Sequence, residues 1–186
     1  QSFSKVDASN FEKVKQEAIK VFGGEYEVPY EDMSKRIEEQ IAEAKISDQV
    51  MFNQNDAGVE INFRGALFFD LGSAELRDEA RELLSKIIPI VAEKSKDFGI
   101  TIEGHTDDIP IKSDRFASNW ELSSVRACSV LRLFEEMGFP RDRIKAAGFA
   151  DTKPTFPNRD ENGESLPENQ AQNRRVVIKI LRDVAP

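Results

Sequence analysis

The sequence has few of the side chains on which metal centres and nucleophilic enzymes depend. Its 186 residues include one cysteine, Cys128, and one histidine, His105. A lone cysteine excludes an intrachain disulfide and a metal site built on several thiolates. With no second histidine to build a catalytic dyad, we interpret Cys128 as a core residue and expect no enzymatic nucleophile.

Long apolar runs and a surplus of positive charge are also missing. No apolar run approaches the length needed to cross a bilayer. Asp and Glu number 34 against 26 Lys and Arg, and the resulting net charge of −8 argues against a nucleic-acid partner. Because the chain starts at Gln1, we expect a piece of a longer protein, with an N-terminal anchor or signal missing.

The pattern of residues 1–57 predicts two amphipathic helices and little else. The first follows a capping box that starts at Ser9, and two glycines end it at residues 23–24. The second follows Pro29 and places apolar residues along one stripe, at Met33, Ile37, Ile41 and Ala44. Each stripe is too narrow to fold alone, so we predict a helical arm that packs on the main domain or on a second copy of itself.

Residues 58–186 alternate between strand and helix patterns and form the predicted main domain. Strands are expected at residues 59–63, 98–103, 144–149 and 176–181. The polar stretch from residue 151 to 172, with its three prolines, predicts a long exposed loop. The predicted fold class is an α/β sandwich: one mixed sheet packed on two helices, with the N-terminal helical arm.

Two helices should cover this sheet. One starts near Arg77, and Pro89 within it should kink or split it. The other starts at Ser118, where Glu121 completes a capping box, and its expected buried residues are Leu122, Val125, Leu131, Phe134 and Met137.

Two charged residues lie where a sheet presents its loops. Asp107 directly follows a predicted strand, and Arg126 lies on the next helix beside its apolar stripe. Arg126 could simply bury its stem and pair with a nearby carboxylate. Alternatively, Asp107 would accept hydrogen bonds from the ammonium of a zwitterionic amino-acid group while Arg126 binds its carboxylate.

Other chemistry at the same strand end has less support. His105 and Asp107, with Asp108 beside them, offer two metal ligands and no third of the usual kind, so we interpret His105 as structural. Asp107 and Glu121 could form a glycosidase carboxylate pair, but chance pairs are plentiful among 34 acidic residues.

Motifs that bind cofactors are likewise missing. Gly72 and Gly104 are isolated turn glycines that form no phosphate-binding loop, so no cofactor is expected.

The start of the last strand carries two arginines. Arg174 and Arg175 could alternate across an edge strand and pair with surface acids. One of them could instead lie beside Asp107 and hold its carboxylate ionised and oriented.

Taken together, five motifs in this order resemble the OmpA-like peptidoglycan-binding domain and span residues 58–182. They are Leu67-Phe68-Phe69-Asp70 with Gly72-Ser73-Ala74-Glu75-Leu76, Gly104-His105-Thr106-Asp107, Asn119-Trp120-Glu121-Leu122-Ser123-Ser124-Val125-Arg126-Ala127, Gly148-Phe149-Ala150-Asp151 and Asn173-Arg174-Arg175-Val176.

Within that superfamily the chain resembles the B subunit of the flagellar motor stator, the MotB and PomB family. Asp108-Ile109-Pro110-Ile111 replaces the short glycine turn of other members, and a long insert continues to Trp120. The stretch from Phe3 to Gly24 is similar to the segment that follows the membrane anchor of this subunit. The transmembrane helix itself, with its ion-carrying Asp, is not in this chain.

The resemblance implies a non-catalytic periplasmic anchor of a protein in the bacterial inner membrane, active in motility and chemotaxis. It implies that Asp107 and Arg126 bind the diaminopimelate of the peptide stem. Thr106, Asn119 and the Phe69-Asp70-Leu71 turn would line the site, with Arg174 and Arg175 in support. The implied partners are peptidoglycan, a second copy, the stator A subunit and flagellar basal-body ring proteins.

Two alternatives stay open. One is an envelope-tethering outer-membrane protein of the same superfamily, against which the 57-residue arm argues. The other is an enzyme acting on peptidoglycan, which the lone His105 and the missing nucleophile disfavour.

Overall fold

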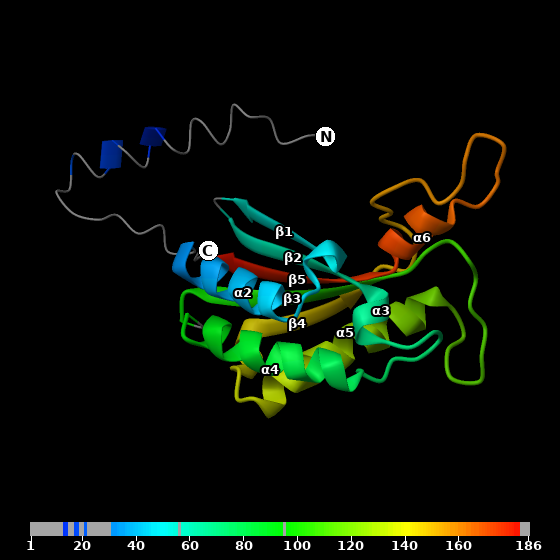
Figure 1. Ribbon diagram of the computed structural model, residues 1–186. Coiled ribbons are helices and arrows are strands. Elements are labelled where there is room, and N and C mark those ends of the chain that lie inside the picture. Colours follow the sequence, from blue (N-terminus) through cyan, green and yellow to red (C-terminus); the bar gives the residue numbers. More distant parts are fainter. Residues whose placement is uncertain are drawn as a thin grey trace.

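The computed structural model describes residues 31–182 apart from 56 and 95, together with residues 13, 14, 17, 18 and 21 (Figure 1). The helix predicted to start at Ser9 lies outside the described residues except at those five positions. Among the described residues, no helix combines the length and the apolar character that a membrane span requires.

Five strands form one mixed sheet in the order β1-β2-β5-β3-β4, which confirms the predicted fold class. β3 and β4 are parallel, and the other neighbours are antiparallel. The strands are β1 (Val50–Asn55), β2 (Gly58–Arg64), β3 (Phe98–His105), β4 (Ile144–Gly148) and β5 (Arg175–Arg182).

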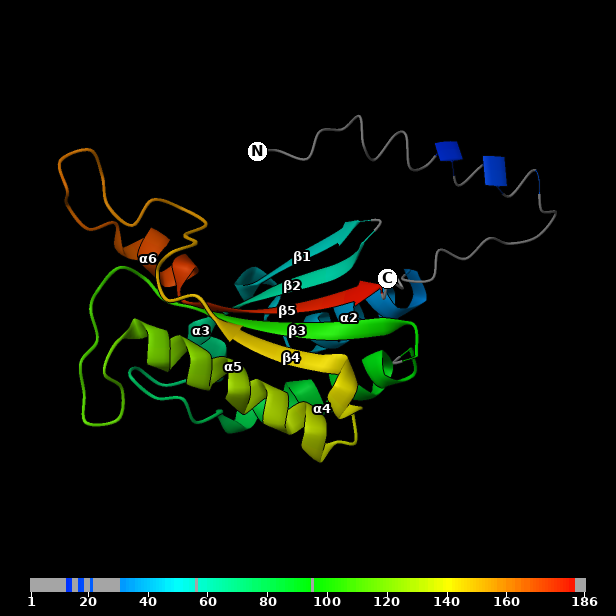
Figure 2. The same ribbon diagram turned by 180° about the vertical axis from the view of Figure 1, so that it is seen from behind.

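Helices α4 (Asp78–Ala92) and α5 (Asn119–Glu136) cover one face of the sheet, and α2 (Glu31–Glu43) packs against α4 (Figures 1 and 2). The predicted loop at 151–172 turns helical in its last part. The short elements are α3 (Gly65–Phe68), α6 (Pro167–Asn173) and the 3₁₀ turns η1 (Ser47–Gln49) and η2 (Arg141–Arg143).

Alternation along each strand separates an apolar face from a polar one. In β2, Val59, Ile61 and Phe63 are buried towards the helices, whereas Glu60 and Asn62 point to the opposite face. Burial of alternate residues places the core between the sheet and α4 and α5, and leaves the other sheet face polar.

Residues 31–55 contribute to this core. Met33, Ile37 and Ile41 of α2 are buried as their spacing predicts, whereas Ala44 lies beyond the helix and is exposed. Arg36 donates two hydrogen bonds to the carboxylate of Glu93, at 2.6 and 2.9 Å, and joins α2 to the residue after α4.

The prediction of helices alone for residues 1–57 is wrong at Val50–Asn55, which forms the edge strand β1. Three amide side chains at residues 53–55 interrupt the apolar alternation there, so pairing with β2 decides the conformation. Residue 57 lies in the hairpin turn, where the Asn55 side chain accepts hydrogen bonds from the main-chain N–H groups of Ala57 and Gly58.

Both covering helices differ in part from their predictions. α4 continues through Pro89 without splitting. α5 begins as predicted, with the Ser118 hydroxyl accepting a hydrogen bond from the N–H of Trp120. Its buried face is rotated from the predicted one: Val125 and Met137 are 38% and 36% exposed, and Cys128 is exposed and not a core residue. The buried side is Leu122, Ser123, Arg126, Ala127, Ser129, Val130, Leu133 and Phe134.

Two glycines explain why small side chains of α5 face the sheet. A Cβ on Gly104 of β3 would lie 2.1 Å from the carbonyl oxygen of Ser123. A Cβ on Gly148 of β4 would lie 2.2 Å from the Ser124 hydroxyl oxygen. The backbone of α5 therefore lies almost directly on the ends of these two strands.

A buried charged cluster lies on the polar sheet face beside Gly104. His105 Nε2 is 3.0 Å from the Glu103 carboxylate, which also accepts a hydrogen bond from Lys179 at 2.9 Å. The His105 ring stacks on Phe149, and its Nδ1 is buried without a hydrogen-bond partner. Burial raises the pKa of Glu103, but the bonds from His105 and Lys179 outweigh it and lower the pKa to about 2. Burial lowers the pKa of His105, against the effect of Glu103.

We expect Gly104→Ala to lower the free energy of unfolding by roughly 1–3 kcal/mol, because a methyl group must displace the backbone of α5. Urea denaturation measures the change. Lys145→Ala, an exposed substitution on β4, is the control and should stay within about 0.5 kcal/mol of the parent. Equal stability of Gly104→Ala and the parent would contradict the close packing.

Acid should destabilise the domain in two steps. The lowered pKa of His105 gives stability that is present above its ordinary value of 6.5 and lost below it. The lowered pKa of Glu103 gives stability that is present above 4.5 and lost as the pH falls towards 2. Thermal melts of Glu103→Gln should show a weaker acid dependence in the lower range, whereas exposed Glu43→Gln should follow the parent. Parallel curves for all three proteins would rule out this role of Glu103.

Candidate functional site

The chain leaves β3, begins α5 and starts β5 at one end of the sheet (Figure 2). Asp107 lies just beyond β3, and Arg126 lies on α5. Asp107 is the second residue after β3. Arg126 is on the side of α5 that packs against the sheet at Gly104 and Gly148, and it is only 8% exposed.

The carboxylate of Asp107 is buried and held on both oxygens. Oδ1 accepts a hydrogen bond from the main-chain N–H of Ile109 at 3.0 Å, and Oδ2 accepts one from Nη1 of Arg174 at 2.5 Å. Thr106 is also buried, and its hydroxyl donates to the carbonyl of Asp107 at 2.8 Å. A carboxylate has about four lone-pair directions, so the Asp107 oxygens keep acceptor capacity for a ligand.

The guanidinium of Arg126 is fixed by main-chain carbonyls and an aromatic ring. Nε donates to the carbonyl of Ser73 at 2.8 Å, and Nη2 donates to that of Asp70 at 3.3 Å. The guanidinium carbon lies 5.0 Å from the centre of the Phe69 ring. Among the described residues, no carboxylate forms an ion pair with Arg126, and its Nη1 makes no hydrogen bond.

The electrostatics of the site favour an anion. Burial, and to a smaller extent the charge of Arg174, lower the pKa of Arg126 to about 10 against the opposing effect of Asp107. Arg126 is therefore still a cation at neutral pH. Two guanidinium groups thus face one carboxylate, a local positive surplus in a chain with a net charge of −8.

The two arginines at the start of β5 point in different directions. Arg174 contacts Asp107, as one of the two interpretations of this pair required. Arg175 instead donates to the carbonyls of Asn173 and Lys153, at 3.2 and 2.9 Å, and extends to the polar sheet face. Arg174 is the arginine positioned to orient the Asp107 carboxylate.

The turn after α3 brings its three predicted residues to the site in different ways. Phe69 is buried beneath Arg126. Asp70 offers its main-chain carbonyl to Arg126, whereas its carboxylate is exposed and lies 3.9 Å from Arg77. Leu71 is 97% exposed, so its side chain is free to contact a ligand.

The loop after Asp107 is braced by side chains on both sides. Asn119 donates its amide hydrogen to the carbonyl of Ile109 at 3.0 Å, so its predicted place beside the site is a bracing position. Asp108 accepts hydrogen bonds from Arg159 at 2.6 Å and from Gln170 at 2.8 Å. Sequence reasoning missed this brace, because its partners are 51 and 62 residues away and no local pattern marks them.

The weaker interpretations of the acidic residues find no support in the geometry. Within the described part of the chain, no group of three His, Cys, Asp or Glu side chains is placed to hold a metal ion. The Glu121 carboxylate accepts the hydroxyl hydrogen of Ser118 at the start of α5, while Asp107 is held by Arg174.

Comparison with known proteins places these motifs in a family. The OmpA family matches residues 68–168. The Bacillus subtilis protein YtxE, itself uncharacterised, is 33% identical over 153 residues, which cover 82% of this chain and 60% of YtxE. Motility protein B of Bacillus subtilis is 32% identical over 152 residues, covering 81% of this chain and 56% of that protein. The chain thus spans little more than half the length of these relatives.

Solved structures share the fold. A MotB-like protein from Desulfovibrio vulgaris has a TM-score of 0.70 at 24% identity, covering 91% of this chain and 99% of that one. The cell wall anchor of the T6SS from Pseudomonas aeruginosa scores 0.67 at 30% identity, with 80% and 98% covered. The periplasmic domain of Helicobacter pylori MotB scores 0.63 at 26% identity, with 73% and 83% covered. The chain therefore belongs to the OmpA family, and it contains a non-catalytic peptidoglycan-binding domain related to MotB.

Proposed function

We propose that this domain anchors a flagellar motor stator to the cell wall by binding the diaminopimelate of the peptidoglycan stem between Asp107 and Arg126. The observation that carries the proposal is the buried Arg126 guanidinium, held by carbonyls and without a carboxylate partner among the described residues. Such a group binds a carboxylate with little reorganisation, because its position and its desolvation are already set.

The rest of the site is complementary to a zwitterion. The stem carboxylate would bind Nη1 of Arg126 together with the second N–H of Nη2, which donates only one hydrogen bond within the described chain. Its ammonium would donate to the remaining lone pairs of Asp107. Arg174 keeps Asp107 in place, and exposed Leu71 can pack against the aliphatic part of the ligand. Thr106 and Asn119 hold the surrounding loop through their bonds to the carbonyls of Asp107 and Ile109.

The stator role rests on the relatives and on the sequence resemblance. Motility protein B of Bacillus subtilis aligns with 81% of this chain. A stator subunit would be tethered in the inner membrane, pair with a second copy and with the stator A subunit, and meet the basal-body ring proteins. Within the N-terminal arm, residues 1–57, the part that precedes α2 would connect the domain to that tether.

A second candidate is an envelope tether without a motor. The cell wall anchor from Pseudomonas aeruginosa is as similar as the motor proteins are, at 30% identity. The outer-membrane lipoprotein YfiB of the same species is 31% identical over 127 residues, which cover 68% of this chain. Both candidates would use the same binding site and differ in what the domain is attached to.

Asp107 and Arg126 together form what we call the clasp. Loss of either residue should abolish most of the binding to the cell wall. Truncating one partner of a buried charge pair costs roughly 2–5 kcal/mol, so Asp107→Asn and Arg126→Ala should weaken binding to isolated sacculi tens- to thousands-fold. Arg126→Lys should also fail, because an ammonium cannot form the planar paired contact with a carboxylate. Co-sedimentation with sacculi measures the loss.

Arg132→Lys is the matched control, since it makes the same change on the same helix, where Arg132 donates to Ser129 and to no other residue that the structure describes. It should sediment like the parent. Normal sedimentation of folded Asp107→Asn and Arg126→Lys would show that these residues form a structural ion network and that the wall binds elsewhere.

Motility separates the two candidates. We expect Asp107→Asn in the full-length protein, expressed in its own motile host, to leave flagella assembled but unable to rotate, because an unanchored stator cannot transmit torque. Swimming speed and flagellar staining are the measurements, with Arg132→Lys as the control. Unchanged motility combined with a weakened envelope would identify the envelope tether instead.

A further inference from the structure

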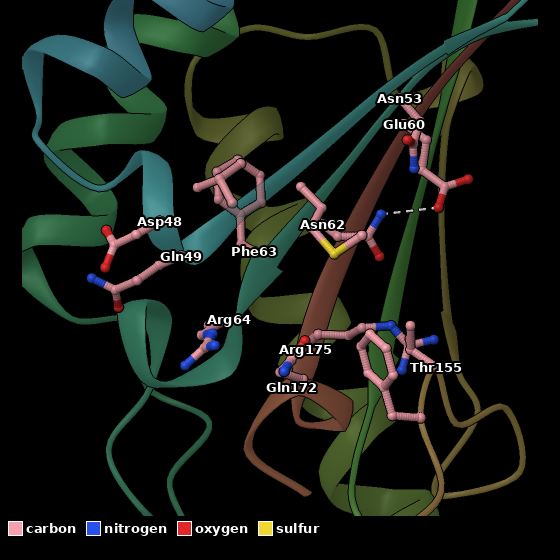
Figure 3. A pocket seen from close by; sticks show the side chains of 13 residues that line it. Asp48, Gln49, Asn53, Glu60, Asn62, Phe63, Arg64, Thr155, Gln172 and Arg175 are labelled. Atoms are coloured by element: carbon pink, nitrogen blue, oxygen red, sulfur yellow. Dashed lines mark hydrogen bonds between the residues drawn. The ribbon is translucent and has the colours of Figure 1, made fainter. Parts of the chain in front are cut away.

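A hollow of about 200 Å³ lies on the polar sheet face, the face opposite α4 and α5 (Figure 3). We name it the outer hollow. It is formed by η1, β1, β2, the start of β5, the loop at residues 155–156 and the end of α6. The side chains that carry the argument are Asn53, Asn62, Phe156, Gln172 and Arg175.

The outer hollow is separate from the Asp107 site, although the chain passes directly from one to the other. Arg174 points to Asp107, and the next residue, Arg175, lines the outer hollow. Neither Asp107 nor Arg126 lines it. A ligand here would be additional to the one between Asp107 and Arg126.

Two acidic and two basic side chains line the outer hollow. Arg175 donates to two main-chain carbonyls through its Nη atoms, whereas its Nε is buried without a hydrogen-bond partner. Burial lowers the pKa of Arg175, against the effects of Glu103 and Glu60. Arg64 pairs with Glu168 at 2.8 Å. Asp48 and Glu60 balance these two cations, so the lining calls for a neutral ligand.

Three amide side chains around the outer hollow are unengaged. Gln49, Asn53 and Gln172 make no side-chain hydrogen bond within the described part of the chain. Asn62 donates to Glu60 at 3.0 Å and keeps its carbonyl oxygen as an acceptor. Amides offer donors and acceptors side by side, which suits hydroxyl and acetamido groups.

An aromatic ring is held at the same place. Phe156 is 37% exposed and lies among the lining side chains. The fully buried Asn173 accepts hydrogen bonds from the N–H groups of Thr155 and Phe156, at 2.8 and 3.1 Å, and donates to the carbonyl of Phe156 at 2.8 Å. The backbone that carries the ring is therefore fixed, which reduces the entropy lost on binding.

From this combination we propose that the outer hollow binds one neutral N-acetylated amino sugar. The apolar face of a pyranose ring would stack on Phe156, and its hydroxyl and acetamido groups would bond to the amides. The proposal rests on the proposed wall-binding function, because the glycan strand of peptidoglycan supplies such sugars. The volume suits a single ring, with the rest of a strand running across the open sheet face.

The test is NMR titration of the domain with a peptide-free oligomer of N-acetylglucosamine at millimolar concentrations. We expect shifts at Asn53, Asn62 and Gln172 and at the ring of Phe156. Phe156→Ala should weaken binding about tenfold or more, the loss of one well-placed stacking partner. Gln172→Glu, which keeps the side-chain shape, should also weaken it by adding a charge that a neutral ligand cannot pair.

The failure of this proposal is distinguishable from failure of the wall-binding site. Asp107→Asn should bind the oligomer like the parent while losing sacculi, and Phe156→Ala should still bind a sugar-free stem peptide. Shifts confined to the surroundings of Asp107, or no shifts at all, would overturn the sugar site. So would binding of the sugar-free peptide in the outer hollow, which would make it a peptide site.

Discussion

The close contact between α5 and the ends of β3 and β4 is the constraint on which the site depends. Because Gly104 and Gly148 have no side chain, the helix backbone lies against both strands. That contact turns Arg126 inward and brings it to the strand end that carries Asp107. A bulkier strand end would hold the helix away, and the two charged groups would then be solvated separately. Packing, and not direct pairing of the charges, sets the geometry of the clasp.

The burial of Arg126 is costly, and the fold supports it without neutralising it. The carbonyls of Ser73 and Asp70 accept its hydrogen bonds, and the face of Phe69 lies against the cation. Carbonyl dipoles stabilise the charge of Arg126 but leave it without a counter-ion. The site therefore favours binding of an anion. Arg174 adds a second positive charge that also favours an anion, and the Asp107 carboxylate can accept hydrogen bonds from an ammonium. A zwitterion offers both groups: a carboxylate for Arg126 and an ammonium for Asp107.

The sequence predicted most of the sheet and helices, because their patterns are local. Residues 59–63 alternate cleanly, and Ser118 forms the predicted cap of α5. Strand β1 was missed because its residues become a strand only by pairing with β2. The buried face of α5 was misassigned because apolar spacing favoured Val125 and Met137, whereas the glycines on the sheet select small residues. Motifs indicated Asp107 and Arg126, but the choice of Arg174 over Arg175 needed the strand register.

Extended backbone also directs neighbouring side chains to the two proposed binding sites, the Asp107 site and the outer hollow. Arg174 has extended backbone between α6 and β5, and Arg175 is the first residue of β5. Successive side chains of extended backbone point to opposite sides, so the two consecutive arginines serve two different surfaces. A single stem residue offers few contacts, and its affinity for one domain is therefore limited by the entropy of binding. The cell wall repeats both its peptide and its sugar at short intervals. A domain that contacts both, in a protein carrying two such domains, would gain avidity from effective concentration without a tighter individual site. Each weak contact could then exchange separately while the anchor as a whole holds.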